Sequence, residues 1–78
     1  MITKEELLSN GLKPYYDDRE IMWTIDFDYV MYNIKEQTLY HFDEVYGKHI
    51  KLCKVTNIDD LIQLIWEYFK IDTNDNWG

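Results

Sequence analysis

The chain has few of the residues on which many small domains depend. Its 78 residues include one cysteine, one proline and three glycines. The single cysteine, Cys53, excludes an intramolecular disulfide and is typical of proteins in a reducing compartment. There is no glycine-rich phosphate-binding loop. Packing of apolar side chains therefore has to supply most of the stability.

Basic residues are also scarce: eight Lys and Arg stand against fifteen Asp and Glu, which gives a formal net charge of -7. A chain of this sign is repelled by nucleic acids and membrane surfaces and is attracted to basic partners. The local basic cluster is Lys48, Lys51 and Lys54, and regular alternation along a strand would divide it between two faces. We therefore expect a basic protein surface as partner, and no direct contact with nucleic acid or membrane.

Long apolar runs are absent as well. The longest candidate, residues 61–69, is interrupted by Gln63 and Glu67 and is far shorter than the roughly 20 residues of a membrane span. Residues 1–6 do not show the basic-then-apolar order of a signal peptide. We expect a cytoplasmic protein.

Aromatic side chains, by contrast, are abundant: seven Tyr, three Trp and three Phe. High net charge alone is typical of disordered chains, which bury too little apolar surface to offset chain entropy. With a hydrophobic fraction of 46%, this chain can build a core inside an acidic shell. We expect a single α+β domain over residues 1–71, followed by a polar tail over residues 72–78.

Two helices are predicted, one near each end of the domain. Thr3 and Glu6 match the capping box, in which each side chain satisfies a backbone amide of the other residue. The helix that they predict, residues 4–10, ends where Gly11 tolerates a left-handed backbone. Thr56-Asn57 supply an N-cap for a second, longer helix. Its apolar positions recur at helical spacing: Ile58, Leu61, Ile62, Ile65 and Phe69.

Between the helices the apolar period changes to two, which is typical of strands. The pattern predicts four strands, separated by turns at residues 26–28, 35–38 and 43–48. The expected fold is a four-stranded antiparallel meander flanked by a short N-terminal helix and a longer C-terminal helix. The second helix should lie across the sheet as its main cover.

The hairpin around residues 35–38 is predicted to have two apolar faces. Pairing of Ile34 with Leu39 divides its residues into two sets: Val30, Tyr32, Ile34, Leu39 and His41 on one face, and Tyr29, Met31, Asn33, Tyr40 and Phe42 on the other. A sheet covered on one side usually alternates more cleanly between apolar and polar residues. The second face is therefore either covered internally, by the N-terminal helix and Tyr15-Tyr16, or a contact surface for a partner or a second copy.

Acidic residues occur in tight groups, at residues 5–6, 17–18, 26–28, 43–44 and 59–60. Such groups can imitate nucleic-acid phosphates in a basic groove. Helix dipoles and turn chemistry account for the same groups without a partner. The partner-binding hypothesis has an acidic part and an apolar part: Asp17, Asp18, Asp43 and Glu44 would pair with Arg or Lys, and Tyr29, Met31, Tyr40 and Phe42 would supply dry contact area.

No catalytic motif accompanies these features. His41, His49 and Cys53 are the candidate zinc ligands, but their spacing matches no standard zinc finger. Cys53 lies inside a predicted strand, on the same face as His49, without a nearby glycine loop to form an oxyanion hole. We expect no enzymatic activity, no metal and no cofactor.

Residues 2–12 and 55–65 resemble segments of small proteins of bacteriophages and mobile elements. The shared layout is a capped helix ending in a glycine, a meander, and a closing segment of the pattern V-x-x-[helix]-L-x-x-L, and the similarity spans nearly the whole chain. The resemblance implies a phage or mobile-element origin, where small acidic proteins often inhibit host defence, as anti-CRISPR proteins do. It transfers no site residues.

Together these observations predict a non-enzymatic acidic protein-binding domain. The resemblance implies its specific form, an anti-CRISPR-like inhibitor that occupies a basic surface of a host defence complex. One alternative is a self-associating structural or accessory protein of a phage or mobile element, which would use the second sheet face and form a homodimer. Another is a small enzyme or ligand-binding protein, which a bound metal or a deep polar pocket would favour.

Overall fold

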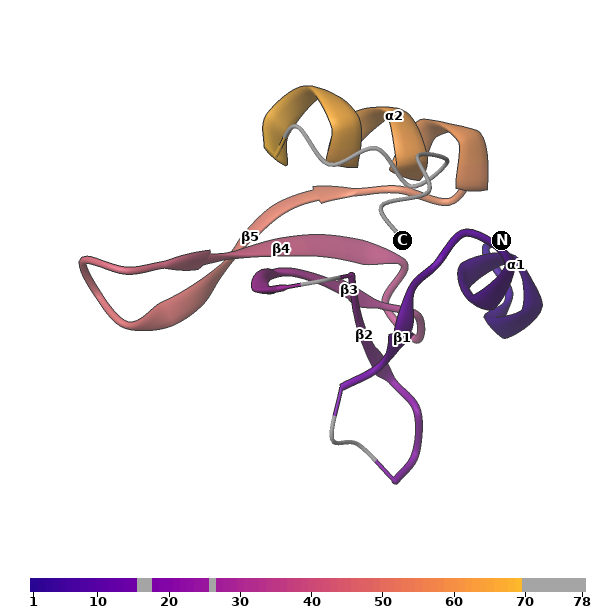
Figure 1. The fold of residues 1–78 in the computed structure, drawn as a ribbon, viewed down its shortest axis with the longest axis horizontal. Helices are drawn as coiled ribbons and strands as arrows, with labels where there is room; N and C mark the ends of the chain where they lie inside the picture. The colour runs from indigo at the N-terminus through magenta and orange to yellow at the C-terminus, as the bar shows by residue number, and fades with distance from the viewer. Residues whose placement is uncertain (16–17, 26, 70–78) are drawn as a thin grey trace.

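A computed structural model describes residues 1–15, 18–25 and 27–69, with the side chains of residues 27–29 excepted. Its elements are, in chain order, α1 (Lys4–Ser9), β1 (Lys13–Pro14), β2 (Met22–Ile25), β3 (Phe27–Asn33), β4 (Thr38–Asp43), β5 (Lys48–Lys54) and α2 (Ile58–Phe69). The strands form one antiparallel sheet in sequence order, with α2 along one side of it and α1 near one end (Figure 1).

The predicted α+β class is confirmed, but the predicted number of strands is wrong, because the sheet has five strands and not four. The additional strand, β1, pairs Lys13 with Thr24 and Pro14 with Trp23. Two residues are too few to show an alternating pattern, and proline usually argues against a strand. Pro14 is tolerated because β1 is an edge strand, where a missing amide donor disrupts no second ladder.

The C-terminal helix has 12 residues, twice the six of α1 but short in absolute terms. The predicted turn at residues 26–28 is tighter than expected, since β3 already begins at Phe27. Asp26 and the predicted polar tail lie outside the described residues.

Helix α1 is capped as its sequence predicts. The Thr3 hydroxyl accepts a hydrogen bond from the Glu6 amide at 3.2 Å, and the Glu6 carboxylate accepts one from the Thr3 amide at 3.0 Å. At the other end Gly11 adopts a φ of +88°, and the Leu12 amide donates to the Leu7 carbonyl at 3.0 Å. This Schellman-type ending brings Leu12 back toward Leu7, and both side chains are buried.

Helix α2 is also capped as predicted. The Asn57 side-chain oxygen accepts hydrogen bonds from the amides of Asp59 at 2.8 Å and Asp60 at 3.3 Å. Leu61 and Ile65 are fully buried in the core. The apolar stripe therefore faces the sheet, and α2 acts as its cover (Figure 1).

The register of the β3–β4 hairpin differs from the predicted one. Tyr32 pairs with Leu39 and Val30 with His41, because the turn occupies residues 34–37 instead of 35–38. Moving a four-residue turn by one residue shifts the pairing by two, and an even shift returns every side chain to its original face. The predicted division into two faces therefore survives the wrong register.

The core is one cluster on one side of the sheet. Its buried members come from both helices, three strands and the connections: Ile2, Leu7, Leu12, Trp23, Ile25, Val30, Tyr32, Leu39, Val55, Leu61 and Ile65. Both helices therefore cover the same face, so the alternative in which the N-terminal helix covers the second face is wrong. The physical reason is the Schellman-type ending, which turns the chain so that α1 stays beside the core. Of the two tyrosines in that alternative, Tyr15 is partly buried and its amide donates to the Met22 carbonyl at 2.9 Å, whereas Tyr16 lies outside the described residues.

A buried glutamine joins three parts of the chain. Gln37, only 4% exposed, accepts a hydrogen bond from the Ile2 amide at 2.7 Å and donates to the carbonyls of Ile2 at 3.1 Å and Ile34 at 2.7 Å. Its own carbonyl accepts the Val55 amide at 2.8 Å. The side chain pairs with the backbone of Ile2 much as a neighbouring strand would. Gln37 thereby ties the N-terminus and the β5–α2 connection to the β3–β4 turn.

The same connection is held a second time by Tyr32. Its buried hydroxyl donates to the Val55 carbonyl at 2.5 Å, and burial raises the pKa of this hydroxyl far above the ordinary value. Val55 thus has both backbone groups bonded to residues of the β3–β4 hairpin. The end of β5 and the start of α2 are fixed relative to the sheet.

Replacing Gln37 by alanine should lower the free energy of unfolding by about 2–4 kcal/mol, because two buried backbone groups of Ile2 lose their partners. Urea unfolding followed by tryptophan fluorescence measures this. Gln37→Gly removes the same bonds but relieves the left-handed φ of +54°, so it should recover about 1 kcal/mol of the loss. Gln63→Ala, at an exposed position, should cost less than about 0.5 kcal/mol. An unchanged midpoint for both Gln37 variants would show that these bonds are dispensable.

Candidate functional site

Strands β4 and β5 form a hairpin whose base lies in the sheet, where β4 pairs with β3 from Thr38 to His41, and whose outer part extends away from the rest of the molecule (Figure 1). Their pairing runs from Thr38 and Lys54 at the base to Asp43 and Lys48 at the end. We call residues 38–54 the arm and its turn, residues 44–47, the tip. Four residues of the predicted partner-binding set lie on the arm: Tyr40, Phe42, Asp43 and Glu44.

Asp43 organises the tip. Its Oδ1 accepts hydrogen bonds from the amides of Val45 at 2.8 Å and Tyr46 at 3.4 Å, and its carbonyl accepts one from the Gly47 amide at 2.7 Å. Gly47 has a φ of +64°, a left-handed value that glycine adopts at little cost. Turn chemistry therefore accounts for Asp43 without a partner, whereas its neighbour Glu44 is exposed.

The tip holds two large apolar side chains in solvent. Val45 is 85% exposed and Tyr46 is 73% exposed. Sequence reasoning missed both residues, because they fall within a predicted turn, where polar residues are usual. A signal was present, however: Val45 and Tyr46 are adjacent apolar residues in a predicted turn whose other members are charged residues and one glycine.

The second face of the sheet is less open than the sequence suggests. Met31, on the strand between β2 and β4, is only 3% exposed and offers almost no contact area on the isolated domain. Phe42 is partly buried, and its ring centroid lies 5.2 Å from that of His49. The side chain of Tyr29 and the whole of Asp17 lie outside the described residues.

Tyr40 lies on this face beside an acid. Its hydroxyl donates to the Glu36 carboxylate at 2.7 Å. This hydrogen bond, with smaller contributions from burial and from the charge of Glu36, raises the pKa of Tyr40. The Glu36 carboxylate is thus engaged by a neighbour on its own hairpin.

A bulge in the arm brings two lysines to one face. Tyr40 pairs with Lys51 and Thr38 pairs with Lys54, with a register shift between Leu39 and Tyr40. Thr38 and Tyr40 are two residues apart on β4 and share a face, so their cross-strand partners share it too. Lys48 pairs with Asp43 and lies on the other face, so the three lysines are divided between two faces as expected, but the bulge places Lys54 with Lys51 and not with Lys48. We call Lys51 and Lys54 the basic stripe.

The same bulge separates the two residues that were expected to share a face of β5. His49 pairs with Phe42, on the side of the basic stripe, whereas Cys53 pairs with Leu39, whose side chain belongs to the core side. Both His49 and Cys53 are exposed, and His41 is partly buried. Within the described residues, no three His, Cys, Asp or Glu side chains lie together as ligands of one metal ion.

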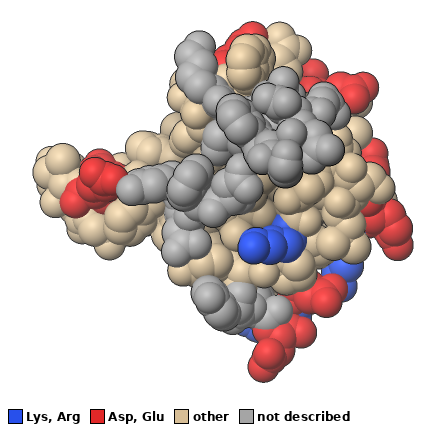
Figure 2. Space-filling view, in the orientation of Figure 1, with Lys and Arg blue, Asp and Glu red and all other residues tan. Residues whose placement is uncertain are grey.

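The acidic residues do not form one surface. Asp18 is exposed in the β1–β2 connection, at a different corner of the molecule from the tip that carries Glu44 (Figure 1). On the face drawn in Figure 2, acidic side chains occupy separate patches around the outline, and one patch marks the end of the arm. The structure thus brings Asp43 and Glu44 together with the arm's aromatic residues, but not with Asp18.

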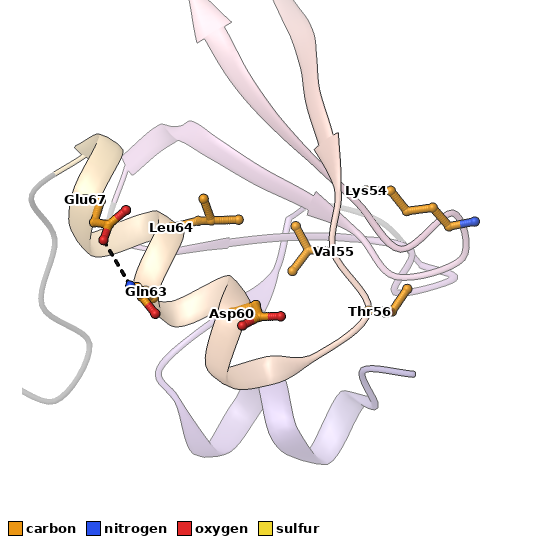
Figure 3. Close-up of a pocket in the computed structure, with 7 residues that line it drawn as sticks. All are labelled: Lys54, Val55, Thr56, Asp60, Gln63, Leu64 and Glu67. Carbon is orange, nitrogen blue, oxygen red and sulfur yellow. Dashed lines mark hydrogen bonds between the residues drawn. The ribbon is translucent and has the colours of Figure 1, made fainter.

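An open hollow of about 360 Å³ lies between the end of β5 and α2 (Figure 3). Its lining is mixed: Lys54, Val55, Thr56, Asp60, Gln63, Leu64 and Glu67. The Gln63 side chain donates to Glu67 at 3.0 Å, and Lys54 points away from the hollow. Its charged side chains are all exposed, so the hollow does not resemble the deep polar pocket that would favour an enzyme.

Comparison with protein-family models, curated proteins and solved structures gives no match to this chain. Among the helices that the structure describes, neither has the length and apolar character needed to cross a membrane.

The role assigned to Asp43 can be tested by separating its hydrogen bonds from its charge. Asp43→Asn keeps a side-chain acceptor for the Val45 and Tyr46 amides, whereas Asp43→Ala removes it. We expect the alanine variant to lose about 1 kcal/mol of stability and amide-exchange protection at the tip, and the asparagine variant to retain most of both. Amide hydrogen exchange by NMR measures the effect. Equal loss in the two variants would mean that the charge of Asp43, and not the turn, orders the tip.

Proposed function

We propose that this chain is a non-enzymatic protein-binding domain that docks through the tip of its arm on a basic surface of a larger protein. The observation that carries the proposal is the exposure of Val45 and Tyr46 at the end of an extended, internally hydrogen-bonded hairpin. Interface energy is commonly concentrated in a few aromatic and apolar anchors.

The order of the tip supports the proposal. The hydrogen bonds that Asp43 accepts and the left-handed Gly47 define the turn before any partner is met. A preformed turn loses less conformational entropy on binding than a flexible loop does. Tyr46 is also well suited to a contact, because its ring has few rotatable bonds and its hydroxyl can remain hydrated at the rim.

The sign of the charge supports a basic partner. Glu44 is exposed beside the apolar pair, and the formal charge of the whole chain is -7. The overall charge would accelerate the encounter with a basic surface, and Glu44 would pair with Arg or Lys at the contact. Asp18, at another corner, would contribute to attraction at a distance without touching the same contact.

An inhibitor that covers a basic groove of a host defence complex is the specific form of this proposal that the resemblance to phage and mobile-element proteins implies. Such an inhibitor needs a pre-shaped acidic surface and no chemistry of its own. The tip supports this form of the proposal with a hydrogen-bonded turn and one exposed acidic residue, Glu44.

The experiment is capture of partners by the tagged full chain from an extract of its native host, with identification by mass spectrometry. The captured protein is then purified, and its Kd is measured. Tyr46→Ala should weaken binding by about thirtyfold, since anchor residues contribute about 2 kcal/mol or more. Glu44→Lys should weaken it further as salt is lowered, because an attraction becomes a repulsion.

Tyr68→Ala is the matched control, because Tyr68 is 65% exposed on α2 and is not part of the arm. Its Kd should equal that of the unchanged chain. Equal losses for Tyr46→Ala and Tyr68→Ala, or a captured partner whose binding surface is acidic, would contradict the proposal.

A further inference from the structure

The arm carries opposite charges toward its two ends. At the tip, Asp43 and Lys48 face each other across the ladder and offset one another, which leaves the exposed Glu44 as the net charge. Toward the base, the basic stripe of Lys51 and Lys54 is exposed. Within the described residues, no carboxylate lies within ion-pair distance of either stripe lysine.

These charges are evenly placed about the middle of the arm. His41 and Ile50 form the central pair of the ladder. Glu44 lies three residues beyond His41, and Thr38, the partner of Lys54, lies three residues before it. At about 3.4 Å per residue, the acidic and basic ends are each about 10 Å from the centre.

We propose that the arm pairs with the arm of a second copy of this chain, antiparallel and related by a two-fold axis at its centre. In this arrangement Glu44 of each copy faces Lys54 of the other, so a single pattern supplies two equivalent ion pairs. Self-complementarity of this kind is what an isologous interface requires. The inference goes beyond the proposed function and does not depend on it.

The middle of the arm supplies the apolar part of the contact. Tyr40 and Phe42 are partly buried on the face of the basic stripe, with His49 against Phe42. A two-fold axis at the arm's centre places these rings against their counterparts. Glu36 lies beside this region, and its carboxylate accepts the Tyr40 hydroxyl at 2.7 Å. Charged ends around an aromatic centre match the usual division of an interface into rim and core.

The basic stripe has two rival roles, and each predicts a different behaviour. Lysines on an edge strand also deter strand-to-strand aggregation, and β5 is an edge strand; in that case removal of the charge would increase association. A basic stripe can also hold an acidic segment of another protein. Neither role depends on where Glu44 lies relative to Lys54. Pairing of two arms, in contrast, requires that the two residues lie at equal distances from the centre of the arm.

The test is a charge swap followed by sedimentation equilibrium over a dilution series of the full chain. The unchanged chain should show a monomer–dimer equilibrium. Glu44→Lys and Lys54→Glu should each weaken dimerisation by roughly tenfold or more, because each reversal acts at two symmetry-related contacts. The double variant Glu44→Lys/Lys54→Glu rebuilds both pairs with inverted sign and should restore the original Kd to within about threefold.

Matched controls carry the same changes in net charge elsewhere. Glu5→Lys on α1 and Lys13→Glu on β1 are at exposed positions outside the arm, and both should dimerise like the unchanged chain. Circular dichroism confirms that every variant is folded. Because Met31 is buried, a substitution there would confuse loss of the dimer with loss of the fold, so the exposed charges are the better probes.

Several outcomes would overturn the inference. One is an unchanged chain that stays monomeric at every concentration. Others are single reversals no weaker than the controls, and a double variant that is not rescued. Tighter association of Lys54→Glu would assign the stripe to edge protection. A monomer whose Lys51 and Lys54 resonances shift with an added glutamate decapeptide would assign the basic stripe to binding of an acidic segment.

Lys54 takes no part in the proposed tip contact. Loss of dimerisation in Lys54→Glu with unchanged partner capture would therefore separate the two proposals.

Discussion

The fold depends on the buried pairing between the Gln37 side chain and the backbone of Ile2. A six-residue helix such as α1 is not stable alone, so it has to be held from both sides. Gln37 fixes the chain before α1, and burial of Leu7 and Leu12 fixes its end. Because the Gln37 carbonyl also accepts the Val55 amide, the N-terminus and the entry to α2 meet at one turn. Both helices are thereby kept on one face of the sheet, and the arm extends beyond the body that they cover.

The features that could be predicted from sequence are those set by neighbouring residues. The Thr3–Glu6 capping box, the glycine ending of α1 and the Asn57 cap of α2 depend on spacings of a few positions, and the structure has all three. Gln37 could not be predicted, since its partner Ile2 lies 35 residues away and a polar residue in a turn is usually exposed. Strand β1 was missed for a related reason: its two residues are defined by pairing with β2 and not by any pattern of their own.

The candidate site shows that a predicted sheet face depends on whether an error in strand register is an even or an odd number of residues. In the β3–β4 hairpin the predicted register was wrong by an even number, and the faces were preserved. In the arm a single additional residue in β5 reverses the alternation of side chains beyond the bulge. Lys51 and Lys54 therefore lie on one face, and His49 and Cys53 lie on opposite faces. Alternation along the sequence gives no sign of such a bulge, because it arises from pairing with β4. Both errors concern register, but only the second one changes which side chains a partner would meet.

The position of each acidic residue explains more about the properties of this surface than the formal charge of -7 does. Glu6 and Asp43 accept hydrogen bonds from backbone amides, Glu36 accepts the Tyr40 hydroxyl, and Glu20 forms an ion pair with Lys4 at 3.1 Å. Asp59 and Asp60 lie in the first turn of α2, where the helix dipole favours negative charge. These acids have local structural roles, and on the face drawn in Figure 2 the acidic side chains are spread over separate patches. Net charge therefore governs attraction at long range, where individual positions do not matter. Under the proposed function, selectivity at contact would depend on the arm, where Glu44, the apolar tip and the basic stripe follow one another along one hairpin.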